Sequence, residues 1–227
     1  MDDREAVLYT GQTFTGRSGH DYVLGSKIGD GGFAGIFLAV EQGTGREVAV
    51  KVLAISNRRA EAVGEFQDEA ALLGVLTSCS NVVTLIDHGE HVMHLQAQGG
   101  GPVLPVPVPF MVLERAVGSL EELLANRHQI EWIDRLTLYR EVAKGVHQMH
   151  LRRFVHRDVK SENGLVFEDD PKARISDLGR SKNTRDDARF PPIAYEAGRG
   201  DIRFAPPELL WRLGDDSAAT HFRIDLY

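Results

Sequence analysis

The alternation of apolar residues between Tyr22 and Ile55 is the feature that most constrains the fold of this chain. Apolar side chains recur at every second position in three runs, which are Tyr22 and Leu24, then Ile36, Leu38 and Val40, then Val48, Val50 and Val52. A period of two is typical of β-strands. The connections KIGDGGFAGIF and EQGTGRE are rich in turn residues. Because short turn-rich connections join antiparallel neighbours, the sequence predicts a three-stranded antiparallel meander.

The glycine-rich stretch KIGDGGFAGIF, Lys27 to Phe37, is a candidate phosphate-binding loop. Glycines let backbone N–H groups approach an anion closely, although tight hairpins also collect glycines for conformational reasons alone. A dinucleotide-binding fingerprint runs from a strand into a helix, and a P-loop closes with Gly-Lys-Ser/Thr. This stretch leads instead into the strand-like run IFLAV and lacks that closing sequence. Both of those nucleotide-binding architectures are therefore disfavoured.

The segment from Asn57 to Val75 changes to the period of a helix. Its apolar stripe consists of Val63, Phe66, Ala70 and Leu73. Glu69 lies at the edge of this stripe, and a carboxylate at a buried edge requires a cation as its partner. Two further strand-like runs follow, NVVTLID and PFMVLE. We expect the glycines at 99–101 and the alternating prolines after them to form a loop that feeds the second of these strands.

The second half of the chain is predicted to be mainly helical. Ser119 and Glu122 in GSLEELLAN have the spacing of a capping box, which starts a helix. A longer helix is indicated by Trp132, Leu136, Tyr139, Val142, Val146 and Met149. The change from strands to helices falls near 114–118, so we expect a sheet-rich first part and a helical second part.

The composition excludes some classes of function. The chain has 227 residues and a net charge of −7, which argues against general binding to nucleic acid or anionic membranes. Cys79 is the single cysteine, so an internal disulfide is impossible and a reducing compartment is the simpler expectation. The first residues lack the apolar core of a signal peptide, and the most apolar run, 102–113, is too short to span a bilayer. We therefore expect a cytoplasmic location and no membrane segment in this chain.

The segment FVHRDVKSENGLVF contains the residues most indicative of chemistry. Asp158, Lys160 and Asn163 lie between a predicted helix and a short apolar strand, and Asp177 follows in ARISDLGR. Two carboxylates, an amide and a lysine on loops are the groups that bind a divalent metal and position a hydroxyl for phosphoryl transfer. The segment therefore predicts a phosphotransfer site.

These segments resemble the eukaryotic-type Ser/Thr protein kinases, whose catalytic loop reads H-R-D-L-x-x-x-N and whose metal-binding loop reads D-F-G. Further landmarks occur in the family's order, namely the glycine-rich loop at 28–36, the strand lysine motif at 48–51, its helix partner Glu69, the strand entering the hinge at 110–114, the A-P-E-like 205–208 and Asp225 of the central helix. The resemblance covers about 22–227. It implies an α+β, bilobal protein-kinase-like fold, with an antiparallel β-sheet N-lobe carrying one regulatory helix and a mainly helical, incomplete C-lobe.

The resemblance also implies a division of the chain into four parts. An N-terminal extension covers 1–21, the N-lobe 22–113, the hinge 114–118 and a partial C-lobe 119–227. Family catalytic domains continue well beyond the position of Tyr227, and the arginine that usually pairs with the A-P-E glutamate, here Glu208, is missing. We therefore expect a C-terminally truncated fragment that folds poorly or phosphorylates weakly alone, because apolar residues would lose their cover.

The resemblance implies a role for each polar side chain of the site. Lys51 would bind the α- and β-phosphates of ATP and pair with Glu69. Asp158 would accept or orient the proton of the attacking hydroxyl. Lys160 would contact the transferred phosphate, and a lysine at this place is typical of Ser/Thr kinases rather than tyrosine kinases.

The implied cofactors are ATP and Mg²⁺ (or Mn²⁺), with the metal held by Asn163 and Asp177. Leu113 would lie at the back of the nucleotide pocket. The implied ATP-binding residues are Ile28, Gly29, Asp30, Gly31, Gly32, Phe33, Ile36, Ala49, Lys51, Glu114, Ala116 and Leu165. The implied partner is a protein substrate that presents Ser or Thr.

Regulation by phosphorylation is implied at Arg157. Kinases with an arginine beside the catalytic aspartate are often switched on when a phosphorylated activation-loop residue pairs with it. The hydroxyls available after Asp177 are those of Ser181, Thr184 and Tyr195, among which we favour Thr184. His156 is expected to be a packed structural residue rather than an acid–base catalyst.

Three positions depart from the family's pattern. Ala34 replaces the third glycine of the loop, and Leu178 replaces the phenylalanine of D-F-G. Asp201 stands two positions before Arg203, where Ser/Thr kinases usually have a threonine that contacts the catalytic aspartate and lysine. The first two changes preserve small or apolar character, whereas Asp201 puts the substrate class in doubt.

Two alternative functions stay open at this point. A kinase-fold binding or scaffold module with weak or no catalysis is favoured by Asp201 and by the missing part of the C-lobe. A small-molecule phosphotransferase shares a similar active site, although the A-P-E-like segment speaks against it. The sequence does not indicate the substrate, the upstream signal or the oligomeric state.

Overall fold

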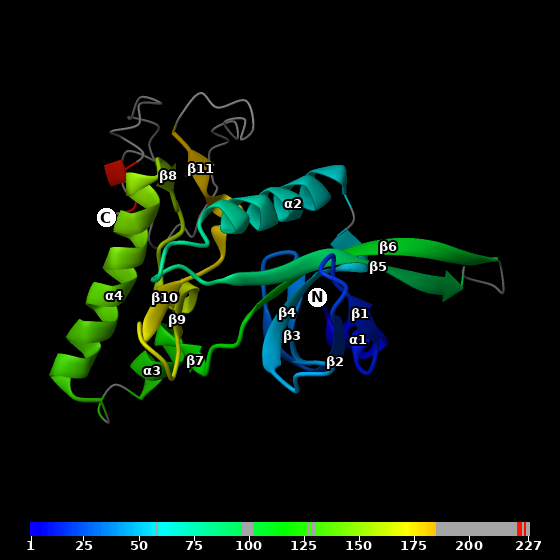
Figure 1. Ribbon diagram of the computed structural model, residues 1–227, viewed down its shortest axis with the longest axis horizontal. Helices are drawn as coiled ribbons and strands as arrows, with labels where there is room; N and C mark the ends of the chain where they lie inside the picture. The colour runs from blue at the N-terminus through cyan, green and yellow to red at the C-terminus, as the bar shows by residue number, and fades with distance from the viewer. Residues whose placement is uncertain are drawn as a thin grey trace. The chain divides into compact units, whose positions relative to one another are not determined.

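The computed structural model describes residues 1–57, 59–96, 102–126, 128, 130–184, 222, 223 and 225 (Figure 1). The chain divides into two compact units. The first unit comprises Met1–Ala71 and Thr84–Arg115, and the second comprises Leu72–Val83 and Ala116–Tyr227. Asp201, Tyr195 and the A-P-E-like 205–208 lie outside the described residues.

The first unit is built on a six-stranded sheet with the strand order β1-β2-β3-β4-β6-β5. The strands are β1 (Thr13–Thr15), β2 (Asp21–Asp30), β3 (Ala34–Glu41), β4 (Glu47–Leu53), β5 (Leu85–Gln96) and β6 (Val103–Glu114). Neighbouring strands are antiparallel throughout. The predicted antiparallel meander is confirmed as β2, β3 and β4.

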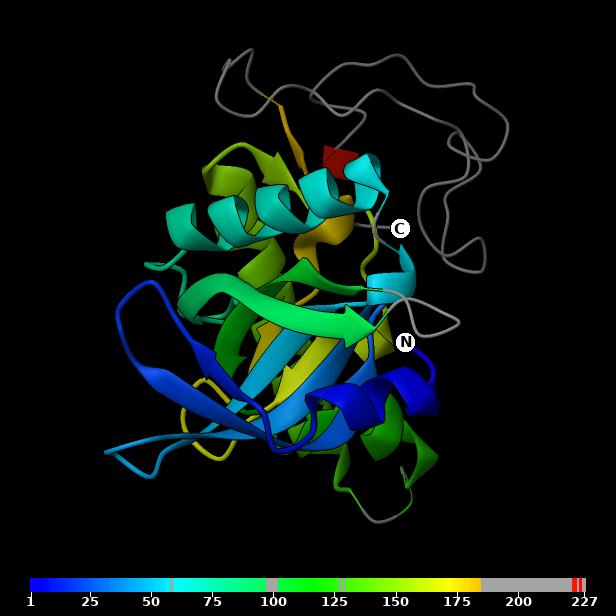
Figure 2. The same ribbon diagram turned by 90° about the vertical axis from the view of Figure 1, so that its right-hand side faces the viewer.

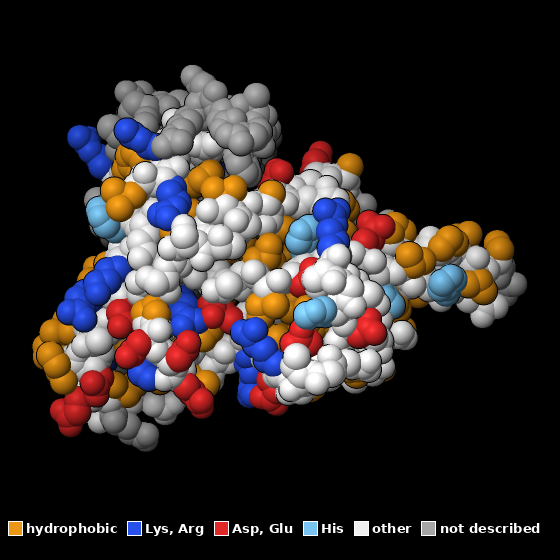
Figure 3. Space-filling model, viewed as in Figure 1, with side chains coloured by type: hydrophobic (Ala, Val, Ile, Leu, Met, Phe, Trp, Pro, Cys, Tyr) orange, Lys and Arg blue, Asp and Glu red, His pale blue; other side chains and the backbone are white. Residues whose placement is uncertain are grey.

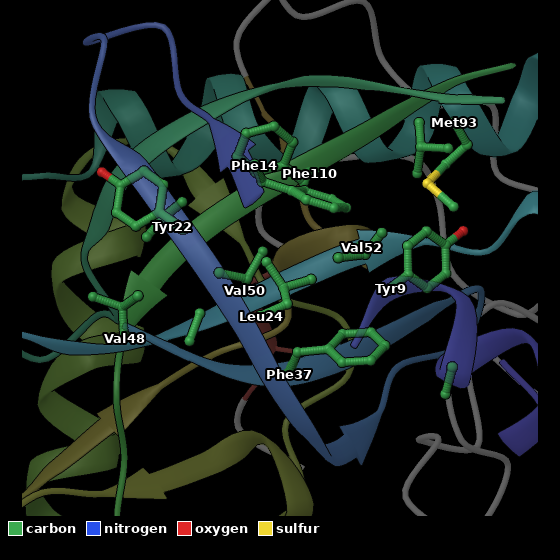
Figure 4. Packing of buried hydrophobic residues seen from close by; sticks show 14 residues of the cluster. Tyr9, Phe14, Tyr22, Leu24, Phe37, Val48, Val50, Val52, Met93 and Phe110 are labelled. Carbon is green, nitrogen blue, oxygen red and sulfur yellow. The ribbon is translucent and has the colours of Figure 1, made fainter. Parts of the chain in front are cut away.

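The two faces of this sheet have different characters because successive side chains of a strand point to opposite faces. Val48, Val50 and Val52 of β4 belong to the buried aromatic cluster. Figure 4 shows these valines among Tyr9, Phe14, Tyr22, Leu24, Phe37, Met93 and Phe110. Ala49 and Lys51 occupy the intervening positions, so they project from the opposite face. The period-two pattern thereby separates the core from the candidate site.

Residues 1–21, the predicted N-terminal extension, form part of the first unit. Helix α1 (Asp3–Tyr9) begins after Asp2, whose side chain accepts a 2.7 Å hydrogen bond from the N–H of Glu5. Strand β1 then pairs with β2. Figure 2 shows α1, in dark blue, beside the strands of the sheet.

Helix α2 (Ala60–Val75) follows β4 after the short turn Ile55–Asn57. Its buried positions are Ala62, Phe66, Glu69, Leu72 and Leu73. The buried face of α2 is therefore rotated slightly from the predicted apolar stripe. Glu69 lies within this buried face instead of at its edge. A charge at the centre of a buried face requires a partner, which is described below.

The hairpin of β5 and β6 departs from the expected loop, because the alternating prolines lie within strand β6. Pro105, Pro107 and Pro109 stand opposite residues of β5. They occupy every second position, so their missing N–H groups share one edge of the strand. Strand β4 pairs with β6 only from Phe110 onward. In the described part of the chain, the edge of β6 that carries the prolines therefore has no neighbouring strand whose hydrogen bonds the prolines would interrupt. Figure 3 shows hydrophobic side chains along this end of the hairpin, where Val103 is 56% exposed.

The second unit is helical with short strands. Its elements are β7 (Gly118–Ser119), α3 (Leu120–Ala125), α4 (Trp132–Leu151), β8 (Phe154–Val155), β9 (Gly164–Val166), β10 (Ala173–Ile175) and β11 (Lys182–Asn183). The strands form a three-stranded sheet, β10-β9-β7, and a two-stranded sheet, β11-β8. The predicted capping box is confirmed at α3, where Ser119 and Glu122 exchange hydrogen bonds of 3.2 and 3.0 Å.

Helix α4 buries only part of its predicted apolar stripe. Val142, Val146 and Met149 are buried, and Gly145 allows the backbone of Asn81 to approach closely, since a Cβ would lie 2.3 Å from that carbonyl oxygen. Trp132, Leu136 and Tyr139 are exposed by 63%, 42% and 72%. The predicted α+β architecture, an antiparallel sheet followed by helices, is confirmed. Every helix in the described residues is too short or too polar for a bilayer span.

Candidate active site

The lysine of β4 and the glutamate of α2 form a buried ion pair in the first unit. Lys51 Nζ lies 2.7 Å from one carboxylate oxygen of Glu69 and 2.8 Å from the other. Their side chains are only 9% and 5% exposed. Removing either partner would leave a buried charge without compensation, which is strongly destabilising. The pair therefore fixes the position of the ammonium group on the face opposite the core.

The glycine-rich stretch forms the tight turn between β2 and β3. The N–H of Gly31 donates to the carbonyl of Ala34 at 2.9 Å, and the carbonyl of Phe33 accepts from the N–H of Ala54 at 3.0 Å. A Cβ on Gly31 would lie 3.4 Å from Lys51 Cε, so the turn lies against the lysine. The N–H groups of Gly32 and Phe33 donate to no described residue. These two groups suit an anionic ligand.

Ile36 and Ala49, which were predicted to contact adenine, and Leu113, which was predicted at the back of the pocket, share the face of Lys51. Ile36 stands opposite Lys51, and Leu113 stands opposite Ala49. Ala49 and Leu113 are 8% and 9% exposed. Ile28, at the irregular end of β2, is exposed, as are Gly32 and Phe33 of the turn. Gly29 and Asp30 end β2 opposite Ile36 and Gly35.

The end of β6 is fixed by contacts with the chain before β5. Glu114 accepts a 2.8 Å hydrogen bond at Oε1 from the N–H of Thr84 and donates its own N–H to the Thr84 carbonyl at 3.2 Å. In the second unit, Ala116 and Leu165 are both half-buried, and Leu165 stands opposite Ser119 in the sheet.

In the second unit, a buried aspartate holds the loop that carries the predicted catalytic residue. Asp225 accepts hydrogen bonds of 2.6 Å from the N–H groups of His156 and Arg157, and its carboxylate lies 2.8 Å from His150 Nε2. Arg157 has a φ of 66°, which is unfavourable for a residue with a side chain. The two hydrogen bonds hold this strained backbone immediately before Asp158.

His156 fixes the next residue of the loop. Its Nε2 lies 2.9 Å from the carbonyl oxygen of Ser176, and its Nδ1 lies 3.2 Å from the N–H of Asp158. Since a carbonyl can only accept, the hydrogen bonds assign the proton to Nε2 and make Nδ1 the acceptor. The fully buried His156 is thus placed as a structural residue.

Asp158, Lys160 and Asn163 converge within the loop between β8 and β9. Lys160 Nζ lies 3.2 Å from Asp158 Oδ2. Asn163 Nδ2 donates to the backbone carbonyl of Asp158 at 2.8 Å and to its Oδ2 at 3.2 Å. The carboxylate is thereby oriented by a cation and an amide at once.

The chemistry of Asn163 and Asp177 suits a divalent metal. Both hydrogen bonds of the Asn163 amide nitrogen go to Asp158, which leaves the amide oxygen to face a cation, and carboxylate and amide oxygens are what Mg²⁺ prefers. Ser176 donates its N–H and its hydroxyl to the Asn163 carbonyl at 2.8 and 3.0 Å. This fixes Asn163 next to Asp177, whose backbone is left-handed at φ 57°. The residues present therefore fit a magnesium or manganese ion.

The predicted regulatory residues Arg157 and Thr184 each hydrogen-bond to a different backbone carbonyl of the second unit. Arg157 Nε donates to the carbonyl of Arg180 at 2.6 Å. Thr184 donates its N–H and its hydroxyl to the carbonyl of Arg153, at 2.8 and 2.9 Å. Lys182, which was not singled out from the sequence, lies in strand β11 and is 5% exposed.

Two further residues were missed by reasoning from sequence. Glu5 contacts Ser56 in the turn between β4 and α2, and Lys27 contacts Asp30 beside the glycine-rich turn. Asp225 was noted in the sequence as a landmark, but its hydrogen bonds to the catalytic loop were not predicted. Glu5 and Lys27 have no motif, and only their contacts in the fold distinguish them from other surface charges.

Comparison with known proteins agrees with this arrangement. A family model described as the protein kinase domain matches residues 22–227. The chain belongs to the protein kinase family. The resemblance noted from the sequence is therefore confirmed.

Several named kinases are similar to this kinase domain. A protein of Acanthamoeba polyphaga mimivirus, named as a serine/threonine-protein kinase/receptor, is 30% identical over 84% of the chain. The calcium/calmodulin-regulated receptor-like kinase 1 of Arabidopsis thaliana is 30% identical over 81%, and the serine/threonine-protein kinase named fhkE of Dictyostelium discoideum is 25% identical over 92%. The chain spans 11%, 38% and 28% of the lengths of these relatives.

Proposed function

We propose that this kinase domain transfers the γ-phosphate of ATP to Ser or Thr hydroxyls of a protein substrate. The observation that carries the proposal is the contact of Lys160 Nζ with Asp158 Oδ2 at 3.2 Å. A carboxylate oriented in this way is suited to accept a hydroxyl proton, while the ammonium beside it is suited to a phosphoryl oxygen. The names of the relatives support Ser/Thr specificity.

The proposed reaction assigns different tasks to the residues of the two units. Lys51, held by Glu69, binds the α- and β-phosphates, and the N–H groups of the glycine-rich turn face the phosphates. The substrate oxygen forms a bond to the γ-phosphorus as the bond to the β-phosphate oxygen breaks, and ADP leaves. Asp158 receives or orients the hydroxyl proton, and Lys160 offsets charge on the transferred group.

The proposed metal ligands are Asn163 and Asp177. A bound Mg²⁺ or Mn²⁺ would supply neutralisation of the phosphate charge. Ile28, Ile36, Ala49 and Leu165 are the proposed apolar contacts of adenine, with the backbone of Glu114 and Ala116 at its edge. Cys79 is buried and has no disulfide partner, which supports the proposal of a reducing, cytoplasmic location.

The test is phosphate transfer from labelled Mg-ATP to a Ser/Thr protein acceptor, with identification of the labelled amino acid. We expect Asp158→Asn to lower turnover by about 10²–10⁴-fold, the usual range for a lost general base, with ATP binding retained. Asp134→Asn is the matched control, because Asp134 is exposed in the first turn of α4 of the same unit.

Three outcomes would contradict the proposal. Label on a metabolite rather than on protein would indicate a small-molecule phosphotransferase. ATP binding without any transfer by the wild-type chain would indicate a binding or scaffold module. Equal turnover of the wild type and Asp158→Asn would remove Asp158 from the reaction.

A further inference from the structure

Residues 1–21 precede the segment that the family model matches, yet their aromatic side chains lie in the core of the first unit. Tyr9 and Phe14 are fully buried. The ring of Tyr9 lies 5.7 Å from that of Phe37, and the ring of Phe14 lies 5.1 Å from that of Phe110, both edge-to-face. Aromatic side chains of this kind bury about 150–250 Å² each.

The same segment contributes one edge strand of the sheet, β1, and contacts the other edge strand, β5. Strand β1 pairs with β2, and beyond its end the N–H of Arg17 donates to the carbonyl of His88 in β5 at 2.9 Å. The rings of Phe14 and His91 stack at 4.1 Å. Ser18 contacts the carboxylate of Asp87 through both its N–H and its hydroxyl. The first and last strands in the sheet order are thereby linked by the N-terminal segment.

Glu5 of α1 binds the connection between the strand of Lys51 and the helix of Glu69. Its Oε1 accepts a hydrogen bond from the N–H of Ile55, and its Oε2 accepts one of 2.8 Å from the hydroxyl of Ser56. Ile55–Asn57 is the turn that joins β4 to α2. The carboxylate of Glu5 therefore fixes where α2 leaves the sheet.

Lys27 links Met1, just before α1, to Asp30 at the glycine-rich turn. Its Nζ donates to the carbonyl of Met1 at 2.8 Å and lies 2.7 Å from Asp30 Oδ1. The hydrogen bond with Asp30 raises the pKa of Lys27, and the same contact lowers the pKa of Asp30. A Cβ on Gly35 would lie 2.8 Å from the sulfur of Met1. Met1, which precedes α1, thus packs directly on the hairpin that carries the turn.

We propose that α1 positions the nucleotide-binding residues of the first unit through Glu5, which lies on α1, and Lys27, which lies on β2. Glu5 holds the turn that leads to Glu69, and Lys27 holds the strand that leads to Gly31. Glu69 pairs with Lys51, and Gly31 lies against it. The contacts of Glu5 and Lys27 therefore help to fix the position of Lys51. The inference rests on the proposed function, since it assumes that Lys51 binds ATP.

The test compares the affinity for Mg-ATP, measured by displacement of a fluorescent ATP analogue, with thermal stability in the same variants. We expect Glu5→Ala to weaken ATP binding by about tenfold, the factor that corresponds to one lost hydrogen bond to a charged group. Glu5→Gln should restore binding to within about twofold, because its amide oxygen still accepts from Ile55. Val7→Ala is the matched control on α1, where Val7 is 72% exposed, and it should leave affinity unchanged.

Lys27→Met provides a second variant that keeps the aliphatic stem and removes the charge. We expect a raised KM for ATP with a smaller change in kcat, because the residue acts on binding and not on the transfer step. In a Glu69→Gln background the effect of Glu5→Ala should shrink, since residues that act through one contact are not additive.

The outcomes separate this inference from the proposed function. If the wild type fails to bind ATP and Lys51→Ala does not differ from it, the proposed function and the positioning role of α1 both fail. If the wild type binds ATP, Lys51→Ala does not, and Glu5→Ala and Lys27→Met bind as the wild type does, the positioning role of α1 alone fails. A lower melting temperature with unchanged affinity would also overturn it, because it would reduce α1 to a purely structural role.

Discussion

The two units hold their site residues by different means. In the first unit, Lys51 projects from β4, a strand held by backbone hydrogen bonds to its neighbours and by the aromatic core, and Glu69 of α2 pairs with it. In the second unit, Asp158 and Asp177 lie on irregular backbone held by side-chain hydrogen bonds to buried main-chain groups. The first arrangement depends on packed volume, and the second depends on single polar groups. We therefore expect substitutions in the first unit to lower mainly stability, and substitutions in the second unit to lower mainly turnover.

The largest loss of stability is expected in the core of the first unit. Phe14→Ala removes a fully buried ring that contacts Tyr9 and Phe110, and large-to-small changes of this kind cost about 3–5 kcal/mol. The measurement is the free energy of unfolding by denaturant titration. Tyr139→Ala is the control, because Tyr139 is 72% exposed and surface changes stay within about 0.5 kcal/mol. A loss below 1 kcal/mol for Phe14→Ala, on the order of a surface change, would show that β1 is dispensable.

A smaller loss of stability but a large loss of turnover is expected for Asp225→Asn in the second unit. The amide preserves the shape of the side chain but places a donor against one of two backbone N–H groups. We expect a loss of roughly 1.5–3 kcal/mol in stability. Turnover should fall by about 10²-fold, since a small displacement of Asp158 is sufficient for that effect.

The measurements for Asp225→Asn are denaturant titration and steady-state phosphate transfer. Asp68→Asn, at an exposed position of α2, is the control for a neutralised aspartate. Unchanged turnover in Asp225→Asn would mean that the buried carboxylate does not determine the geometry of the catalytic loop.

The smallest loss of stability is expected from Asp87→Asn, and this loss depends on pH. Asp87 is a buried polar residue of the first unit. Burial raises the pKa of Asp87, but hydrogen bonds from Ser18 and His88 outweigh it and hold the pKa below its ordinary value. Tyr22, whose pKa is raised to about 12 by burial and by Asp87, stays protonated as a donor. A lowered pKa contributes stability above the unfolded pKa of about 3.9 and loses it as the pH falls through the folded value.

We therefore expect the wild type to exceed Asp87→Asn by about 1 kcal/mol at pH 7 and by progressively less below about pH 4. Denaturant titrations at pH 7, 5, 4 and 3 provide the check. A difference that persists at the lowest pH would place its origin in packing rather than in the charge.

Local patterns predicted much of the fold, whereas the pairing of Lys51 with Glu69 was implied by the resemblance to the kinase family. Period two separated Val50 from Lys51, and the Ser119–Glu122 spacing located the start of α3. Contacts between distant residues left no such pattern. Asp225 meets the loop it anchors across 68 and 69 residues of chain, so its hydrogen bonds were not predictable from sequence.

The N-terminal segment escaped prediction for a related reason. Strand β1 has three residues, too few to show a period, and on α1 the apolar Val7 and Leu8 are exposed whereas Tyr9 is buried. Helix α4 shows the reverse case, since its apolar Trp132 and Tyr139 followed a helical period but face solvent. In both places the neighbouring elements, and not the local sequence, decide which side chains are covered.

The prolines of β6 have a consequence for encounters between molecules. A strand edge without a neighbour is ordinarily a template on which another chain can add a strand. Along β6, Pro105, Pro107 and Pro109 offer carbonyl groups but no N–H groups, so an incoming strand would meet acceptors without donors. The hairpin can therefore present Val103 and Leu104 to solvent without that edge becoming a nucleus for aggregation.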